Sequence, residues 1–385
     1  MITFNYYDDD NLQAKSHAER LTDNELNLKI EDKLLKEMEL IIQEIKKDFS
    51  EKLVDGIIVD LRLEEKPVNG KKHLYRGTAL AQELRTESSE DGSQSLDFPI
   101  ILLSSETNLL KYNSDYSSHD LFDLVLSKNK FNDNNSDNIK IIKKRLVSLA
   151  KGYRSIKENK NVNSIDKIIG LPKDDISLIY PKFIYSLQQL IDKPIHVIAR
   201  FLKNKLVEPQ GILIERDVLM ARLGIDEANS NPESIKVLFE TKLNGFKYSG
   251  AFSEGWERYW MDLVSRWWDL EVNSHKPINA FPASKRVEQI IDKVKISGLK
   301  AAKPIKTGFS EYFWTVCILS RKPLDPINGF ITISQYDPIN KFPIMAENSE
   351  PWLDKNYVTK DEYILNSPSI NLILDSNDAK LIEED

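Results

Sequence analysis

The chain of 385 residues contains very little cysteine and little histidine. Cys317 is the single cysteine, which excludes an internal disulfide and a multi-cysteine zinc site; its apolar neighbours predict a buried side chain. The five histidines have no metal-ligand spacing, so we expect no zinc site. They are His17, His73, His119, His196 and His275.

Long apolar runs are also absent. No run approaches the roughly 20 residues that span a bilayer, and the start, MITFNYYDDD, lacks the basic and apolar regions of a signal peptide. We therefore expect a cytoplasmic protein without a membrane role. The net charge of −7 makes nucleic-acid binding an unfavoured hypothesis. The motifs of the commoner enzyme classes are missing too: the sequence has no P-loop, dinucleotide fingerprint, nucleophile elbow or HExxH.

The first 150 residues alternate between apolar runs and segments with helical periodicity. This order predicts β-α-β-α-β-α-β-(α)-β-α, with the weakest helix in the polar segment 112–120. Right-handed crossovers would fold it into a doubly wound, five-stranded parallel sheet with helices on both faces, an α/β fold. The strand runs are ITFNYY (2–7), ELNLKIE (25–31), DGIIVD (55–60), FPIILLSSE (98–106) and FDLVLSK (122–128). The helical segments are 13–21, 32–53, 77–85 and 139–154.

Beyond about residue 155, helix-like segments dominate. They predict a second, mainly helical α+β domain, with strand-like YFWTVCILS and GFITIS late in the sequence. We divide the chain into a first domain (1–150), a helical linker (151–163) and a C-terminal domain (164–385) of unassigned function. The predicted helices of that domain are 176–191, 214–223 with Gly224 as C-cap, 232–243, 253–270 and 284–296.

A reactive polar residue follows or ends four of the predicted strands. Asp8 and Asp9 follow the first strand, Asp60 the third, Ser104 ends the fourth, and Lys128 ends the fifth. Parallel strands bring their carboxyl ends to one sheet edge, where such sheets place their chemistry. Converging carboxylates repel one another unless a hard cation lies among them, so the pattern predicts a Mg²⁺ site.

With Mg²⁺ held by Asp8, Asp9 and Asp60, the Asp60 carboxylate could attack a phosphoryl donor and form an aspartyl phosphate. The Ser104 hydroxyl and the Lys128 ammonium would stabilise charge on the transferred group. Two alternatives stay open: residues 8–10 could form a solvated acidic turn, and the hydroxyl could belong to Ser105.

These residues, in this order and with RGTALAQELR between the third and fourth strands, resemble the receiver domain of bacterial response regulators. The resemblance covers residues 1–150 and implies a flavodoxin-like fold, Mg²⁺ and a histidine kinase as phosphodonor. It makes Asp60 the phosphoacceptor, Asp8 and Asp9 the acidic pair, Ser104 the switch hydroxyl and Lys128 the family lysine. A receiver promotes its own phosphorylation, so we expect no separate enzyme activity from this domain.

Three departures from the receiver pattern stand out. The loop after Asp60 is enlarged by EEKPVNGKKHLY, residues 64–75, which we call the inserted segment. Asn129 replaces the usual proline after the lysine, and Val125 replaces an aromatic residue three positions before it. We expect these departures to affect signal transmission more than phosphorylation. The enlarged loop could restrict the range of histidine kinases that dock on this domain. The pattern is similar to divergent receivers of phage-defence gene clusters, including Detocs-type phosphorelays, which would add other phosphorelay or defence proteins as partners.

Two further stretches have a structural and a functional interpretation. On a helix from Ser253, Trp256, Trp260 and Trp267 would form an aromatic stripe that predicts a core-facing helix; binding a partner or single-stranded bases is the alternative. The basic run 140–160 predicts the solvated face of a linking helix, with phosphate binding or kinase docking as the alternative. A pseudo-receiver adaptor that binds protein partners without phosphorylation is the competing function, and ERDVLMARLGID could be half of a helix-turn-helix.

Overall fold

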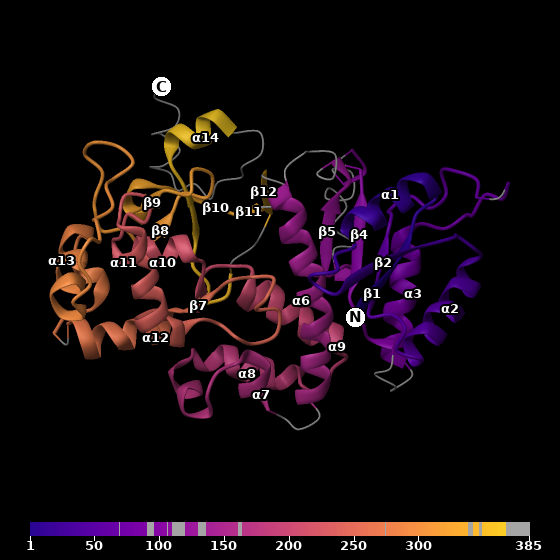
Figure 1. The fold of residues 1–385 in the computed structure, drawn as a ribbon, viewed down its shortest axis with the longest axis horizontal. Helices are drawn as coiled ribbons and strands as arrows, with labels where there is room; N and C mark the ends of the chain where they lie inside the picture. Colours follow the sequence, from indigo (N-terminus) through magenta and orange to yellow (C-terminus); the bar gives the residue numbers. More distant parts are fainter. Residues whose placement is uncertain are drawn as a thin grey trace. The chain divides into compact units, whose positions relative to one another are not determined.

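The computed structural model describes residues 1–68, 70–90, 96–105, 107–109, 120–129, 136–160, 164–273, 275–337, 342–345 and 349–366 (Figure 1). The chain divides into two compact units. The first comprises residues 1–170, 185–203 and 250–256, and the second comprises 171–184, 204–249 and 257–385. Compactness does not test independent folding, so the sequence-based boundary at 150–163 stays a prediction.

The first unit contains the expected parallel sheet. Its strands have the order β2-β1-β3-β4-β5, and every pairing is parallel. This order, with the helical crossovers, is the flavodoxin-like form of the doubly wound fold. The strands are β1 (Ile2–Tyr7), β2 (Leu28–Lys33), β3 (Gly56–Val59), β4 (Ile100–Ser104) and β5 (Leu124–Ser127). The helices between and after them are α1 (Asn11–Leu21), α2 (Met38–Ser50), α3 (Gly77–Glu90) and α6 (Ser136–Lys160).

Helices cover both faces of the sheet because the central strands are apolar on both. Ile57 and Val59 point to the face where α2 and α3 pack, and they share one core with Ile41 and Leu80. The alternate residues point the other way, and Ile58 among them is completely buried. The helix predicted within 112–120 lies outside the described residues, apart from Asp120.

Two of the predicted helices differ from the structure where a strand or a proline intervenes. The helix predicted from Asp32 begins at Met38, because β2 continues to Lys33 and pairs with Tyr7. The helix predicted over 176–191 is broken: a 3₁₀ helix spans Lys173–Leu178, Ile179 is extended, and Pro181 begins α8 (Pro181–Leu190). Proline lacks the amide hydrogen that a helix interior needs but is suited to the first turn.

Residues that follow α6 complete the first unit. After α7 (Ile165–Ile169), helix α9 (Ile195–Leu202) packs against α6. The Asp97 carboxylate, at the amino-terminal edge of the sheet, accepts hydrogen bonds from the backbone amides of Ile195 and His196. Asp97 is 3% exposed, so its partners at the start of α9 replace water. Segment 250–256 also belongs to this unit.

A buried polar network accompanies this contact. The Asp123 carboxylate accepts from Arg85 Nη2 at 2.7 Å and from the Tyr153 hydroxyl at 2.6 Å. Arg85 Nη1 donates to the carbonyl of Phe98 at 2.9 Å. The network joins α3, the strand β5 and α6, and the partners compensate for burying both charged groups.

The second unit is rich in helices and contains two-stranded sheets. Its helices are α10 (Arg216–Leu223), α11 (Pro232–Leu238), α12 (Met261–Trp267), α13 (Ala283–Val294) and α14 (Lys360–Asn366). One-turn π segments extend α9, α11 and α12 at Lys203–Val207, Phe239–Leu243 and Trp268–Val272. The antiparallel pairs are β6 (Leu213–Ile214) with β7 (Tyr259–Trp260), β8 (Thr315–Val316) with β9 (Pro323–Leu324), β10 (Phe330–Thr332) with β13 (Asn356–Val358), and β11 (Ser334–Asp337) with β12 (Phe342–Met345). Gly224 ends α10 in the left-handed conformation, as predicted, and Cys317 is buried.

The helix predicted from Ser253 begins eight residues later, at Met261. Trp260 lies on β7, which pairs with β6, and Trp256 lies in a turn of the first unit. All three tryptophans of the predicted stripe are nonetheless buried. Core packing is confirmed for them, whereas their arrangement as one helical stripe is wrong.

Helix α6 contains most of the basic run. Lys143 pairs with Asp23, whereas Arg145 is 9% exposed and stacks on the ring of Trp256, with 4.8 Å between Cζ and the ring centroid. The solvated-face interpretation is therefore wrong for Arg145. Among the helices that the structure describes, none combines the length and apolar character needed to cross a bilayer.

Candidate functional site

The carboxyl edge of the parallel sheet gathers all five predicted site residues. Asp8 and Asp9 follow β1, Asp60 follows β3, Ser104 ends β4 and Lys128 follows β5. None of the five is more than 9% exposed. For Asp8 and Asp9, this burial rules out the solvated acidic turn; Asp10 instead caps α1 by accepting from the amide of Gln13.

The Lys128 ammonium bridges two of the carboxylates. Its Nζ lies 2.7 Å from Asp8 Oδ2 and 3.1 Å from Asp60 Oδ2. Asp8 also accepts a hydrogen bond of 2.5 Å from the Tyr6 hydroxyl and one of 3.0 Å from the amide of Asp10. The Leu61 amide donates to Asp60 Oδ1 at 2.8 Å. Asp8 and Asp60 are thus fixed relative to one another.

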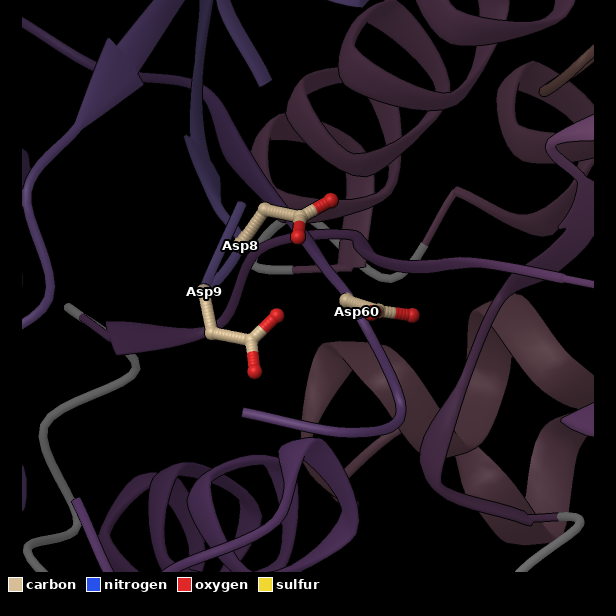
Figure 2. A group of neighbouring side chains, drawn as sticks. All are labelled: Asp8, Asp9 and Asp60. Carbon is tan, nitrogen blue, oxygen red and sulfur yellow. The ribbon is translucent and has the colours of Figure 1, made fainter. Parts of the chain in front are cut away.

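The third carboxylate, Asp9, lies beside this pair. Figure 2 shows Asp8 and Asp9 on one stretch of chain, with Asp60 on the neighbouring one. One ligand atom from each carboxylate lies within 4.8 Å of the others. Among the described residues, this is the only cluster of three potential metal ligands of the His, Cys, Asp and Glu types; His119 lies outside them.

Burial raises the pKa values of carboxyl groups in this cluster, and the positive charge of Lys128 opposes the rise. Burial raises the pKa of Asp60 to about 6, with Asp8 adding to the rise and Lys128 opposing it. Burial also raises the pKa of Asp9. For Lys128, burial is unfavourable to the charged form, but Asp60 and Asp8 together raise its pKa. One ammonium therefore contacts two of the three carboxylates, and negative charge is in excess when all three are ionised.

The Ser104 hydroxyl is the site's free donor. It lies close enough to Asp60 to lower the pKa of that carboxyl, yet its Oγ is buried and forms no hydrogen bond of ordinary geometry. A buried hydroxyl without a partner is costly and is typical of functional sites. Ser105, the alternative, is half-buried, and its Oγ accepts from the Asn108 amide instead.

The donor set fits a divalent cation of the Mg²⁺ type. Each carboxylate offers about four lone-pair positions, and the hydrogen bonds described above use only some of them. Asp8, Asp9 and Asp60 supply the hard oxygen ligands that Mg²⁺ prefers, and the excess negative charge favours a dication. These three residues would hold the ion.

The start of α3 approaches the site closely. Gly77 lies so near the backbone of Asp60 that a Cβ built on it would be 2.1 Å from the Asp60 carbonyl oxygen. Only glycine fits there without moving the backbone of Asp60. RGTALAQELR therefore supplies more than a helix: its glycine allows the chain to return beside Asp60.

Sequence reasoning missed two neighbours of the acidic pair. Tyr6 could have been found, because alternation along β1 places it on the same face as Asp8. Lys66, in the inserted segment, donates its backbone amide to Asp9 Oδ2 at 2.5 Å. No residue pattern marks a backbone donor, so nothing in the sequence indicated this contact.

Comparisons with known proteins add one finding. The chain matches no model of a known protein family and no curated protein. Among solved structures it is similar to the crystal structure of the phosphorylated cyanobacterial phytochrome response regulator RcpA. The two are 16% identical, the match covers 37% of this chain and 89% of that chain, and the TM-score is 0.25. The flavodoxin-like assignment follows from the strand order and connectivity instead.

Proposed function

We propose that this chain is a response-regulator-like protein that accepts a phosphoryl group on Asp60 from a histidine kinase. The observation that carries the proposal is the buried cluster itself: Asp60 contacts the Lys128 ammonium, and the buried Ser104 hydroxyl lies beside it without a hydrogen bond of ordinary geometry. Acceptor, cation and hydroxyl occupy the ends of three adjacent strands, which supports a preorganised phosphoryl site.

The transfer replaces one bond to phosphorus by another. A carboxylate oxygen of Asp60 attacks the phosphorus of a phosphohistidine and forms a P–O bond while the P–N bond breaks. The electron pair of the P–N bond stays on the imidazole nitrogen. Lys128 and Ser104 can then each donate to an oxygen of the transferred group, and Mg²⁺ bound by Asp8, Asp9 and Asp60 would neutralise charge on it. The protein modifies itself and turns over no separate substrate.

Phosphorylation with a small donor tests this proposal. The full chain is incubated with Mg²⁺ and acetyl phosphate, and intact mass is measured over time. We expect a mass increase of one phosphoryl group in the wild type and none in Asp60→Asn, which keeps the shape of the acceptor but removes its nucleophilic carboxylate.

Asp137→Asn is the matched control, because Asp137 is an exposed carboxylate of the same unit. It should be labelled like the wild type. Label that persists in Asp60→Asn, or a wild type that is never labelled by acetyl phosphate or by a histidine kinase, contradicts the proposal. The second outcome would favour the pseudo-receiver adaptor.

The resemblance to divergent receivers supports a place in a phage-defence phosphorelay. In that setting the kinase and further relay proteins are its partners. Loss of protection from phage in cells carrying Asp60→Asn, with wild-type protein levels, is the expected result, and full protection would contradict it.

A further inference from the structure

We propose that the inserted segment positions the metal ligand Asp9, and that Lys66 is the positioning residue through its backbone amide. This inference rests on the proposed function, because it concerns the same Mg²⁺ site. It assigns a role to the departure that most distinguishes this chain from the receiver pattern.

The inserted segment is anchored at several points outside the site. Val68 and Lys71 exchange two backbone hydrogen bonds, and the Val68 side chain is buried in the core shared by α2 and α3. The Tyr75 hydroxyl donates to the carbonyl of Lys36 at 2.7 Å, and Lys71 pairs with Glu37. Lys66 therefore approaches Asp9 from a braced loop.

Backbone donors of the inserted segment restrict the Asp9 carboxylate. The Lys66 amide binds Oδ2, and the amide of Glu65 also stabilises the ionised carboxyl. A carboxylate held by a backbone donor loses less side-chain freedom when it binds a metal, so the affinity rises. The partners of metal ligands typically contribute about 10–100-fold to metal affinity.

The side chain of Lys66 acts in the opposite sense. Its ammonium pairs with Asp10 at 2.6 Å, is more than half exposed, and adds a positive charge beside a site for a cation. Removing the side chain should therefore leave Mg²⁺ affinity equal or raise it, whereas removing the amide should lower it. Two substitutions of Lys66 can therefore separate the effect of its side chain from the effect of its backbone amide.

The test compares Lys66→Ala with Lys66→Pro in the full chain. Alanine removes only the ammonium, whereas proline also removes the amide hydrogen that binds Asp9. Mg²⁺ binding is measured by isothermal titration calorimetry without phosphodonor. We expect Lys66→Ala to bind at least as tightly as the wild type and Lys66→Pro to bind about tenfold more weakly than Lys66→Ala.

Lys72→Ala removes another exposed lysine of the inserted segment and should bind Mg²⁺ like the wild type. A Lys66→Pro protein that binds as tightly as Lys66→Ala overturns the inference. If the proline variant does not fold, hydrogen exchange of the wild-type Lys66 amide decides: protection that increases with Mg²⁺ supports the role, and exchange that Mg²⁺ leaves unchanged overturns it. A wild type that binds no Mg²⁺ overturns this inference together with the metal part of the proposed function, whereas label surviving in Asp60→Asn contradicts the phosphoacceptor alone.

Discussion

At the scale of single residues, the buried Asp60 carboxylate is destabilising when it is charged. Its pKa rises from 3.8 to about 6 because burial disfavours the ionised form more than Lys128 favours it. The folded state therefore binds the proton more tightly than the unfolded state does. Protonation of Asp60 therefore contributes to the free energy of unfolding. This contribution is fully present below about pH 4 and is lost as the pH rises through about 6.

Asp60→Asn should consequently stabilise the protein at pH 8 without Mg²⁺. The expected gain in the free energy of unfolding is up to about 3 kcal/mol, and it should shrink below pH 6 and vanish near pH 4. Urea unfolding at several pH values measures it. Asp10→Asn is the control, because Lys66 lowers the pKa of Asp10 and the substitution should not stabilise at pH 8. A destabilised Asp60→Asn at pH 8 would show that Lys128 outweighs burial.

The convergence of these side chains could be predicted because the information for it is local. Asp8, Asp60, Ser104 and Lys128 each stand next to a recognisable apolar strand, and parallel strands bring such ends together. The Lys66 amide could not be predicted, because every residue except proline has a backbone donor and only the loop's path selects this one. The pairing of Asp97 with α9 joins residues about 100 positions apart and had no local sign.

At the scale of secondary structure elements, the Asp97 carboxylate caps α9 from a distant part of the chain, because Pro194 at the N-cap position provides no side-chain hydrogen bond. Asp97→Ala would leave the amides of Ile195 and His196 without their acceptor in a buried environment. We expect the free energy of unfolding to fall by about 1–3 kcal/mol, as measured in urea at pH 7. Asp137→Ala, an exposed first-turn carboxylate of α6, should change it by less than about 1 kcal/mol. Equal effects of the two substitutions would contradict the capping role.

Strand pairing also explains why the helix predicted from Ser253 was wrong. Trp260 and Trp267 are both buried, so the burial that their spacing predicted is confirmed. However, Tyr259 and Trp260 pair with Ile214 and Leu213, about 46 residues earlier. Periodicity within a window cannot detect a partner outside it.

At the scale of the whole molecule, the unit that contains the flavodoxin-like sheet is completed by residues beyond the α/β segment itself. A fragment of residues 1–163 retains the sheet and α6 but lacks α9, so Asp97 loses the backbone amides of Ile195 and His196. We expect its melting temperature to lie several degrees below that of a fragment of residues 1–203. Differential scanning calorimetry of the two fragments measures this. Equal melting temperatures would show that α9 adds nothing to the stability of the sheet.

Helix α6 is bounded by two stretches of its own chain, α9 and segment 250–256. Gly152 admits the ring of Phe252, since a Cβ there would lie 2.3 Å from it, and Gly255 lies against Arg145 and Ser148. A tethered neighbour has an effective concentration in the millimolar range or above, which few freely diffusing proteins reach. Any other protein that binds these surfaces of α6 must first displace α9 or segment 250–256. We therefore expect signals that pass through α6 to stay within this chain unless one of these segments detaches.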